Sequence, residues 1–313
     1  MNYRVTHTIL ILTSVWLLQS CFTGVESTPK ITYRDVKENR ADRTAPEETL
    51  AEGFIPSGYE EWKPGKRLFV TSDRISLVLT PDNPASALPA ESSEIVFQGD
   101  RELTDLTGRK IVELLFTRPS SSDILAYRTN STREELVSRT KAEVPFTIDL
   151  DLVAKVRSAL VGKDLYVKTP LWFTPDGQAV EGRKFVKVHV TDLLPANEVY
   201  PFRVLFTDSD NGATHFVFMS AGNGSRWAPR EFPAIFSFTD PHLEYPRITD
   251  EVWSYIIRNR VREGMTKPEA RLSLGDPANI DHGHDHTSAY ERWNYSNGIY
   301  LIFEDGLLTR FNR

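Results

Sequence analysis

Hydrophobic and polar residues alternate in many short segments of the chain, a period of two that is typical of β-strands with one buried face. Two of these segments begin with closely similar sequences, GKRLFVTS at 65–72 and GKDLYVKT at 162–169. A second similar pair, GRKIVEL at 108–114 and GRKFVKV at 182–188, follows in the same order. Each motif is a glycine turn followed by a run rich in β-branched and aromatic residues. We therefore predict two repeated β-rich modules, each a small SH3-like barrel or sandwich.

Turn and capping signals connect these segments. DSDNG at 208–212 separates two alternating runs. It lacks the further ligands of a calcium loop, so a hairpin turn is the better interpretation. Helix-start and helix-stop residues predict helices within 131–141 and 149–163. The aromatic and proline-rich segment 226–246 is interpreted as a linker between domains that is held by packed rings, with a ligand groove as the alternative.

The pattern changes to a helical period at residue 248 and keeps it up to Gly275. A helix is predicted after Thr249, and a second one begins at the capping box formed by Thr266 and Glu269 and ends at Gly275. Three alternating runs follow at 289–295, 299–304 and 307–311, separated by Asn-Gly and Asp-Gly turns. The expected order is two helices and then a three-stranded antiparallel sheet.

Composition narrows the class of protein. The chain has 313 residues, of which 40% are hydrophobic and 26% charged, as in ordinary globular proteins. Its net charge is −6, so there is no overall basic surface for nucleic acid, and we expect no nucleic-acid partner. The expected fold class is mainly β with α+β parts.

The N-terminus has the pattern of a secretory signal. Arg4 precedes an apolar stretch from about residue 8 to 18, which is too short to span a bilayer. The stretch ends in Leu18, Gln19, Ser20 and Cys21, and this sequence resembles a bacterial lipobox. The resemblance implies cleavage before Cys21, which is the only cysteine in the chain, and acyl chains on its thiol. The polar residues up to 61 are then expected to form a flexible tether.

The C-terminal segments GMTKPEARLSLGDP, ERWNY and YLIFEDGLLTRF together resemble the SmpA/OmlA (BamE-like) domain of outer-membrane lipoproteins. The residues that carry this resemblance are Gly264, Met265, Thr266, Leu274, Gly275, Pro277, Trp293, Tyr295, Phe303, Asp305 and Gly306. The resemblance covers residues 248–313 and implies two helices packed on a three-stranded sheet that serves protein or envelope contacts.

These observations predict a domain organisation in six parts. They are a lipoprotein signal peptide at 1–20, a lipidated flexible tether at 21–61, β module 1 at 62–130, linking helices at 131–161, β module 2 with a linker at 162–247, and a BamE-like domain at 248–313.

Candidate chemistry is concentrated in one short stretch, which contains His282, His284, Asp285 and His286. These residue types bind zinc or copper, and an extended segment would place the three histidines on one side. No H-E-x-x-H pair and no spaced cysteines accompany them, so a polar loop between helix and strand is the simpler interpretation. Metal binding at this loop remains the alternative.

The sequence has no P-loop and no G-x-S-x-G elbow. We therefore expect a non-enzymatic lipoprotein of the cell envelope, without cofactor, that binds or scaffolds. It would be held at the outer membrane by the acyl chains on Cys21, face the periplasm or the cell surface, and contact an envelope protein partner. The alternatives are an envelope hydrolase acting on glycan or cell-wall material, whose paired carboxylates a sequence cannot place, and a periplasmic metal-binding protein that uses the histidine loop.

Overall fold

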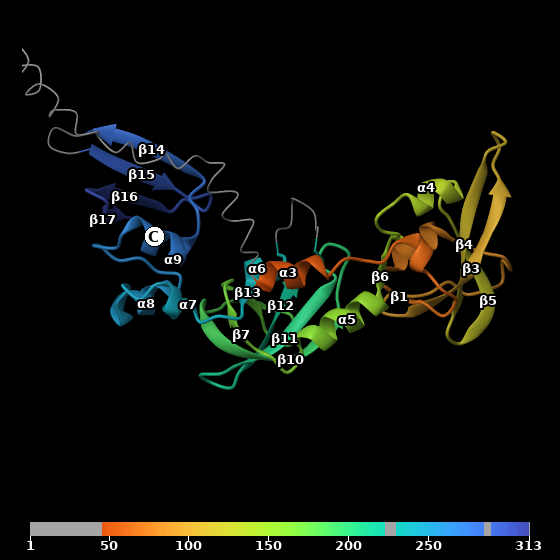
Figure 1. Ribbon diagram of the computed structural model, residues 1–313, viewed down its shortest axis with the longest axis horizontal. Coiled ribbons are helices and arrows are strands. Elements are labelled where there is room, and N and C mark those ends of the chain that lie inside the picture. Colours follow the sequence, from red (N-terminus) through yellow and green to blue (C-terminus); the bar gives the residue numbers. More distant parts are fainter. Residues whose placement is uncertain (1–45, 223–229, 285–288, 313) are drawn as a thin grey trace, which may run out of the picture. The chain divides into compact units, whose positions relative to one another are not determined.

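The computed structural model describes residues 46–222, 230–284 and 289–312 (Figure 1). The chain divides into two units, Met1–Thr44 and Ala45–Arg313, and the second contains all elements described below. This unit is mainly β and contains three antiparallel sheets. Within the described part of the chain, none of the helices has the length and apolar character needed to cross a membrane.

The first sheet has six strands in the order β2-β5-β4-β3-β1-β6. Its core contains large apolar side chains that are far apart in the sequence, among them Trp62, Phe97 and Phe116. The strands are β1 (Arg67–Val70), β2 (Leu79–Pro81), β3 (Glu94–Thr104), β4 (Lys110–Arg118), β5 (Ser121–Arg128) and β6 (Thr147–Asp149).

The second sheet has seven strands in the order β13-β7-β10-β11-β12-β8-β9. The DSDNG turn joins β11 and β12, which pair antiparallel, so the predicted hairpin is confirmed. The strands are β7 (Asp164–Val167), β8 (Leu171–Phe173), β9 (Ala179–Glu181), β10 (Val186–Pro195), β11 (Phe202–Asp208), β12 (Thr214–Met219) and β13 (Phe236–Ser237).

The two sheets repeat one strand order. When β1 is matched with β7, the series β2-β5-β4-β3-β1-β6 becomes β8-β12-β11-β10-β7-β13, and β9 is an addition at the edge. β1 and β7 have the same burial pattern. The register also shifts at matching places, between Phe97 and Gly99 in β3 and between Val190 and Asp192 in β10. The repeat that the first motif pair predicted is therefore present in the strand order.

The second motif pair is not part of this repeat. GRKIVEL leads into β4, whereas GRKFVKV leads into β10, and the strand equivalent to β10 is β3. The two glycines also have different roles. Gly108 has a φ of +85° in the β3–β4 turn, whereas a Cβ at Gly182 would lie 2.2 Å from Trp172 Cδ2. The prediction that these segments are equivalent is wrong, because similar turn sequences serve different hairpins.

The predicted tether is wrong for residues 46–61. Helix α3 (Pro46–Glu52) and the 3₁₀ helix η1 (Tyr59–Glu61) form in this segment. Ala51 and Phe54 are buried in the core of the second sheet, and Tyr59 is buried in the core of the first. Each sheet therefore recruits apolar residues from this acidic segment. Residues 1–45, with the rest of the tether and the signal segment, lie outside the described residues.

The predicted linking helices at 131–161 belong instead to the two cores. Helix α4 (Arg133–Val137) places Leu136 in the core of the first sheet, and a second 3₁₀ helix, η2 (Asp73–Leu77), also packs there. Strand β6 closes that sheet beyond the predicted boundary at 130. Helix α5 (Leu150–Leu160), capped by Asp149, packs its buried face on the second sheet near β10 (Figure 1).

The segment 226–246 is also more than a linker. Helix α6 (Phe232–Ile235) leads directly into β13, where Phe236 pairs with Val167 of β7. Phe232 and Phe236 are buried in the core of the second sheet. A short helix, α7 (Pro241–Glu244), then leads toward the C-terminal helices. Residues 232–237 are thus part of the second sheet and its core.

The C-terminal part begins with α8 (Asp250–Ile256) and α9 (Lys267–Leu274), whose predicted caps at Thr249 and Thr266 are confirmed. The sheet that follows has four strands rather than three: β14 (Asn279–His284), β15 (Ala289–Asn294), β16 (Tyr300–Glu304) and β17 (Leu307–Phe311). The predicted loop before β15 is wrong for residues 279–284, because their backbone pairs with β15 along six positions. Trp253 and Trp293 are buried in the core between helices and sheet.

The loop before β10 contacts this C-terminal part. Lys184 is buried, and its Nζ donates a hydrogen bond to Leu272 O at 2.6 Å and another to Ser273 O, at the C-terminal end of α9. Phe185 lies edge-on to Trp253, with 5.9 Å between ring centroids. The GRKF sequence is therefore explained by contacts with another part of the fold.

Candidate functional site

The outer face of the second sheet carries a cluster of aromatic rings. In β12, Val217 and Met219 point to the core, so Phe216 and Phe218 point outward. Phe173 of β8 pairs with Phe216 and shares this face. We call the cluster, with its neighbouring side chains, the aromatic–arginine surface, which consists of Phe173, Tyr200, Arg203, Phe216, Phe218 and Arg230.

The rings pack in a fixed arrangement. Phe173 stacks on Phe216 with 5.2 Å between centroids, and Phe218 contacts Phe173 edge-on at 5.0 Å. Tyr200, from the β10–β11 turn, lies 6.1 Å from Phe218. Phe216 is only 2% exposed, whereas the other three rings are half-buried. Phe216 thus forms the buried base of the cluster, and the other three rings are partly exposed.

Two arginines lie over these rings. The Arg203 guanidinium is 4.7 Å from the centroid of Phe216, and that of Arg230 is 5.9 Å from Tyr200. Arg230 also donates from Nε to Phe218 O at 2.9 Å. Burial lowers the pKa of the Arg230 guanidinium, although the nearby Tyr200 opposes this shift. Both cations are therefore held against the aromatic face.

Part of the hydrogen-bonding capacity of these arginines is unused. Arg203 Nε and Arg230 Nη2 are buried and have no acceptor among the residues that the structure describes. The pKa of Arg230 is shifted by burial and by Tyr200, and no carboxylate of the described residues is among the causes. Buried polar groups in folded proteins are nearly always hydrogen-bonded. Two of the eight buried side-chain atoms that lack a partner among the described residues thus belong to the arginines of this surface.

Exposed apolar side chains extend the surface. Leu171 lies two positions before Phe173 on the same face of β8 and is 44% exposed. Val199, beside Tyr200 in the β10–β11 turn, is 58% exposed. The surface therefore combines apolar area with cationic groups, a composition common at protein interfaces.

In the first sheet, the residues paired side by side across the equivalent strands neutralise one another's charge. Counted from the register shifts, the row Arg101–Glu113–Arg128 corresponds to Leu194–Arg203–Phe218. Glu113 is 4% exposed and accepts hydrogen bonds from Arg101 Nε at 2.8 Å and from Arg128 Nη2 at 3.3 Å. Arg101 also binds Asp82 through two nitrogens, and this hydrogen bonding holds the pKa of Asp82 below its usual value.

A shallow pocket of about 320 Å³ lies at the end of the β3–β4 hairpin. The Asp105 carboxylate in its wall accepts from Thr107 N at 2.8 Å and from Arg109 N at 3.0 Å, and the Thr107 side chain is the main cause of its lowered pKa. This carboxylate therefore shapes the turn. The lining residues are Leu103, Thr104, Asp105, Leu106, Thr107, Ile111, Arg128 and Asn130.

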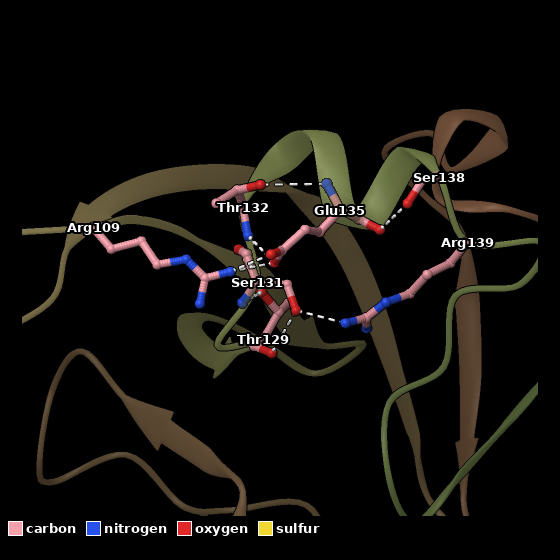
Figure 2. Close-up of polar contacts among 7 residues, drawn as sticks. All are labelled: Arg109, Thr129, Ser131, Thr132, Glu135, Ser138 and Arg139. Carbon is pink, nitrogen blue, oxygen red and sulfur yellow. Dashed lines mark hydrogen bonds and ion pairs between the residues drawn. The ribbon is translucent and has the colours of Figure 1, made fainter.

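The polar cluster next to this pocket, shown in Figure 2, is built to hold local structure. The Glu135 carboxylate accepts from Arg109 Nη2 and, as part of the α4 capping box, from Thr132 N at 3.0 Å. Ser131 Oγ accepts from Arg139 at 2.6 Å. These groups bond to one another, and no histidine contacts the serine within the described chain. The arrangement fixes the β3–β4 turn to α4 and contains no activated nucleophile.

The predicted histidine site is only partly described. His282 and His284 lie on one face of the edge strand β14. His282 Nδ1 is 3.9 Å from Glu291 Oε1, but Lys267 Nζ binds that same oxygen at 2.7 Å. Asp285 and His286, like Leu18, Gln19, Ser20 and Cys21, lie outside the described residues. Within residues 46–222, 230–284 and 289–312, no group of three or more acidic, histidine or cysteine side chains is arranged to hold a metal ion.

The sequence contained a signal for the aromatic–arginine surface that its pattern alone did not resolve. Arg203 interrupts the apolar run of β11, and Phe216 and Phe218 occupy alternate positions in β12. Only the pairing of β8, β11 and β12 brings these side chains together. In comparisons with family models, with curated proteins and with solved structures, the chain has no match.

Proposed function

We propose that this protein is a lipid-anchored lipoprotein of the cell envelope that acts without catalysis, as a binding or scaffolding protein. The observation that carries this proposal is the aromatic–arginine surface of the second sheet. Phe, Tyr and Arg are enriched at protein interfaces and dominate binding energy there. Here Phe173, Phe218 and Arg203 pack on the buried Phe216, and two of the arginine donors lack acceptors within the described chain.

The strand order supports the finer fold that the proposal includes. In each module three successive strands form a meander, and β1 or β7 pairs with the first of them on one side and with the final strand on the other. Such pairing curls a sheet around a single core, as in a small SH3-like barrel. For the C-terminal part we propose a BamE-like domain, supported by the order of α8, α9 and the antiparallel strands.

Anchoring is the second part of the proposal. The lipobox-like sequence ends at Cys21, and the described helix α3 starts at Pro46. Acyl chains on Cys21 would attach the protein to the membrane, with each buried methylene adding about 0.8 kcal/mol. The folded modules would then meet partners in the outer membrane or periplasm.

Site-specific photocross-linking tests the proposed function. Benzoylphenylalanine is placed at Phe218 or Tyr200 in the full chain and irradiated in intact cells. As a matched control it is placed at Leu77, which is 78% exposed in the first module. We expect discrete cross-linked products from the two surface positions and none from Leu77. The same products from all three positions, or none from any, would argue against a binding role for this surface.

A further inference from the structure

We infer that the aromatic–arginine surface binds an acidic peptide segment of a partner protein, in which carboxylate and apolar side chains alternate. This inference rests on the proposed function and specifies the chemistry of its partner.

The charge of the surface determines the sign of the ligand. Arg203 and Arg230 each keep one buried N–H without an acceptor in the described chain. A guanidinium presents several donors in a planar fork, and a carboxylate matches that fork with two acceptors. Both side chains are only half-buried, so an incoming carboxylate would bind the guanidinium nitrogens that remain accessible. An amide would offer one carbonyl oxygen and no charge.

The first sheet provides an internal comparison. At the position equivalent to Arg203 it has Glu113, and the protein itself supplies the two arginines that bind this carboxylate. At Arg203 the two neighbours in the row are Leu194 and Phe218, which offer no acceptor side chain. One copy of the repeat therefore supplies both the carboxylate and its two cations, whereas the other presents a guanidinium over an aromatic ring at the same position.

The apolar part of the surface determines the second feature of the ligand. Phe173 and Phe218 are half-buried, and Leu171 is exposed beside them on the same sheet face. An extended peptide places every second side chain on one side, roughly 7 Å apart. Alternation would therefore let apolar side chains cover the rings while acidic ones reach the arginines. The two guanidinium groups are half-buried and lie over aromatic rings. A single acidic side chain can reach such a group more easily than the flat surface of a bilayer can.

Fluorescence anisotropy with designed peptides tests this inference, using the full chain in neutral detergent micelles. The probes are labelled dodecapeptides in which leucine and phenylalanine alternate with aspartate, with asparagine or with lysine. We expect the aspartate peptide to bind at least ~10-fold more tightly than the asparagine peptide, since charged hydrogen bonds exceed neutral ones. The lysine peptide should not bind. R203Q and R230Q should each weaken aspartate-peptide binding by about 5-fold or more.

The control variant is R74Q, which removes an exposed arginine of the first module and should leave the affinity unchanged. Arg203 lies in a central strand, whereas Arg230 lies outside the strands, so R230Q provides the test if R203Q does not fold. Equal binding of the aspartate and asparagine peptides, or unchanged affinity in R230Q, would overturn the inference. Arginine-dependent binding to phosphatidylglycerol vesicles without peptide binding would overturn it in favour of lipid. Cross-links from Phe218 together with failure of the peptides would reject only this inference and leave the binding role standing.

Discussion

Glu113 and Arg203 occupy equivalent positions in the two repeated sheets, each two residues before the position where the register shifts. The first is a carboxylate bound by two arginines, and the second is a guanidinium whose Nε has no acceptor among the described residues. The two copies of the fold thus carry opposite charges at equivalent positions. Only the carboxylate in the first copy is bound by oppositely charged side chains. Under the proposed function, the first copy is a structural module and the second is the binding module.

The bound state of Glu113 predicts a specific loss of stability. In E113Q the hydrogen bonds to Arg101 and Arg128 lose one charged partner while the shape is kept. We expect the free energy of unfolding to fall by about 1–2 kcal/mol, because a buried acceptor of two cations is weakened. The loss stays in this range because both arginines are partly exposed, so water screens their interaction with Glu113.

Urea unfolding of the full chain measures this change. The matched control is E102Q, since Glu102 forms exposed ion pairs with Lys110 and Arg133, which contribute less than about 1 kcal/mol. Equal unfolding midpoints for E113Q and E102Q would contradict the structural role of Glu113.

Lys184 predicts a pH dependence of stability. Burial lowers its pKa from 10.5 to about 8. Between these values the unfolded chain binds more protons than the folded one, so stability rises as the pH increases from about 8 to 10.5. The rise is limited to at most ~3 kcal/mol, because the carbonyls at the end of α9 favour the charged form.

The variant K184M should lack this contribution, because methionine has a similar length and no charge. Urea unfolding at about pH 7, 9 and 10 compares the variant with the wild type below and within the interval between the two pKa values. We expect the stability of K184M relative to wild type to decrease as the pH rises. Parallel pH profiles for the two proteins would show that Lys184 does not titrate in this window.

The histidine edge predicts a negative result for metal binding. His282 is mostly exposed, and Glu291 beside it is bound to Lys267. We expect calorimetric titration with Zn²⁺ and Cu²⁺ to give equal affinities for the wild type and for a variant in which His282, His284 and His286 are alanine. Binding at least ~10-fold tighter in the wild type would instead favour a metal site, since a fixed site needs several such ligands.

The lipobox-like sequence predicts acylation of Cys21. Cells that express the full chain are fed an alkyne-tagged fatty acid, and labelling of the protein is measured after membrane fractionation. We expect label on the wild type and none on C21S, with C21S released from the membrane fraction because it lacks the acyl chains. Equal labelling and membrane retention of both proteins would contradict the anchor.

Several features were predicted from short stretches because their causes are local. The caps at Thr249 and Thr266 form with residues one turn away, and the turn at Gly306 follows from its positive φ. The first motif pair indicated β1 and β7 because alternation and a glycine turn specify a strand without reference to its partner. The sequence thus determined these caps and this turn, and the first of the two motif pairs correctly indicated equivalent strands.

The remaining features depended on pairing between distant segments. Phe54 is buried only because the second sheet accepts it, and His282 lies in a strand only because β15 pairs with its backbone. The same holds for the candidate site. Phe173, Arg203 and Phe218 come from separate strands, and the sequence states their types but not their common face. Side-chain direction along a strand is local, whereas strand neighbours are set by the whole core. This is why the tertiary structure alone decided that Arg203 and Arg230 lie beside the aromatic rings.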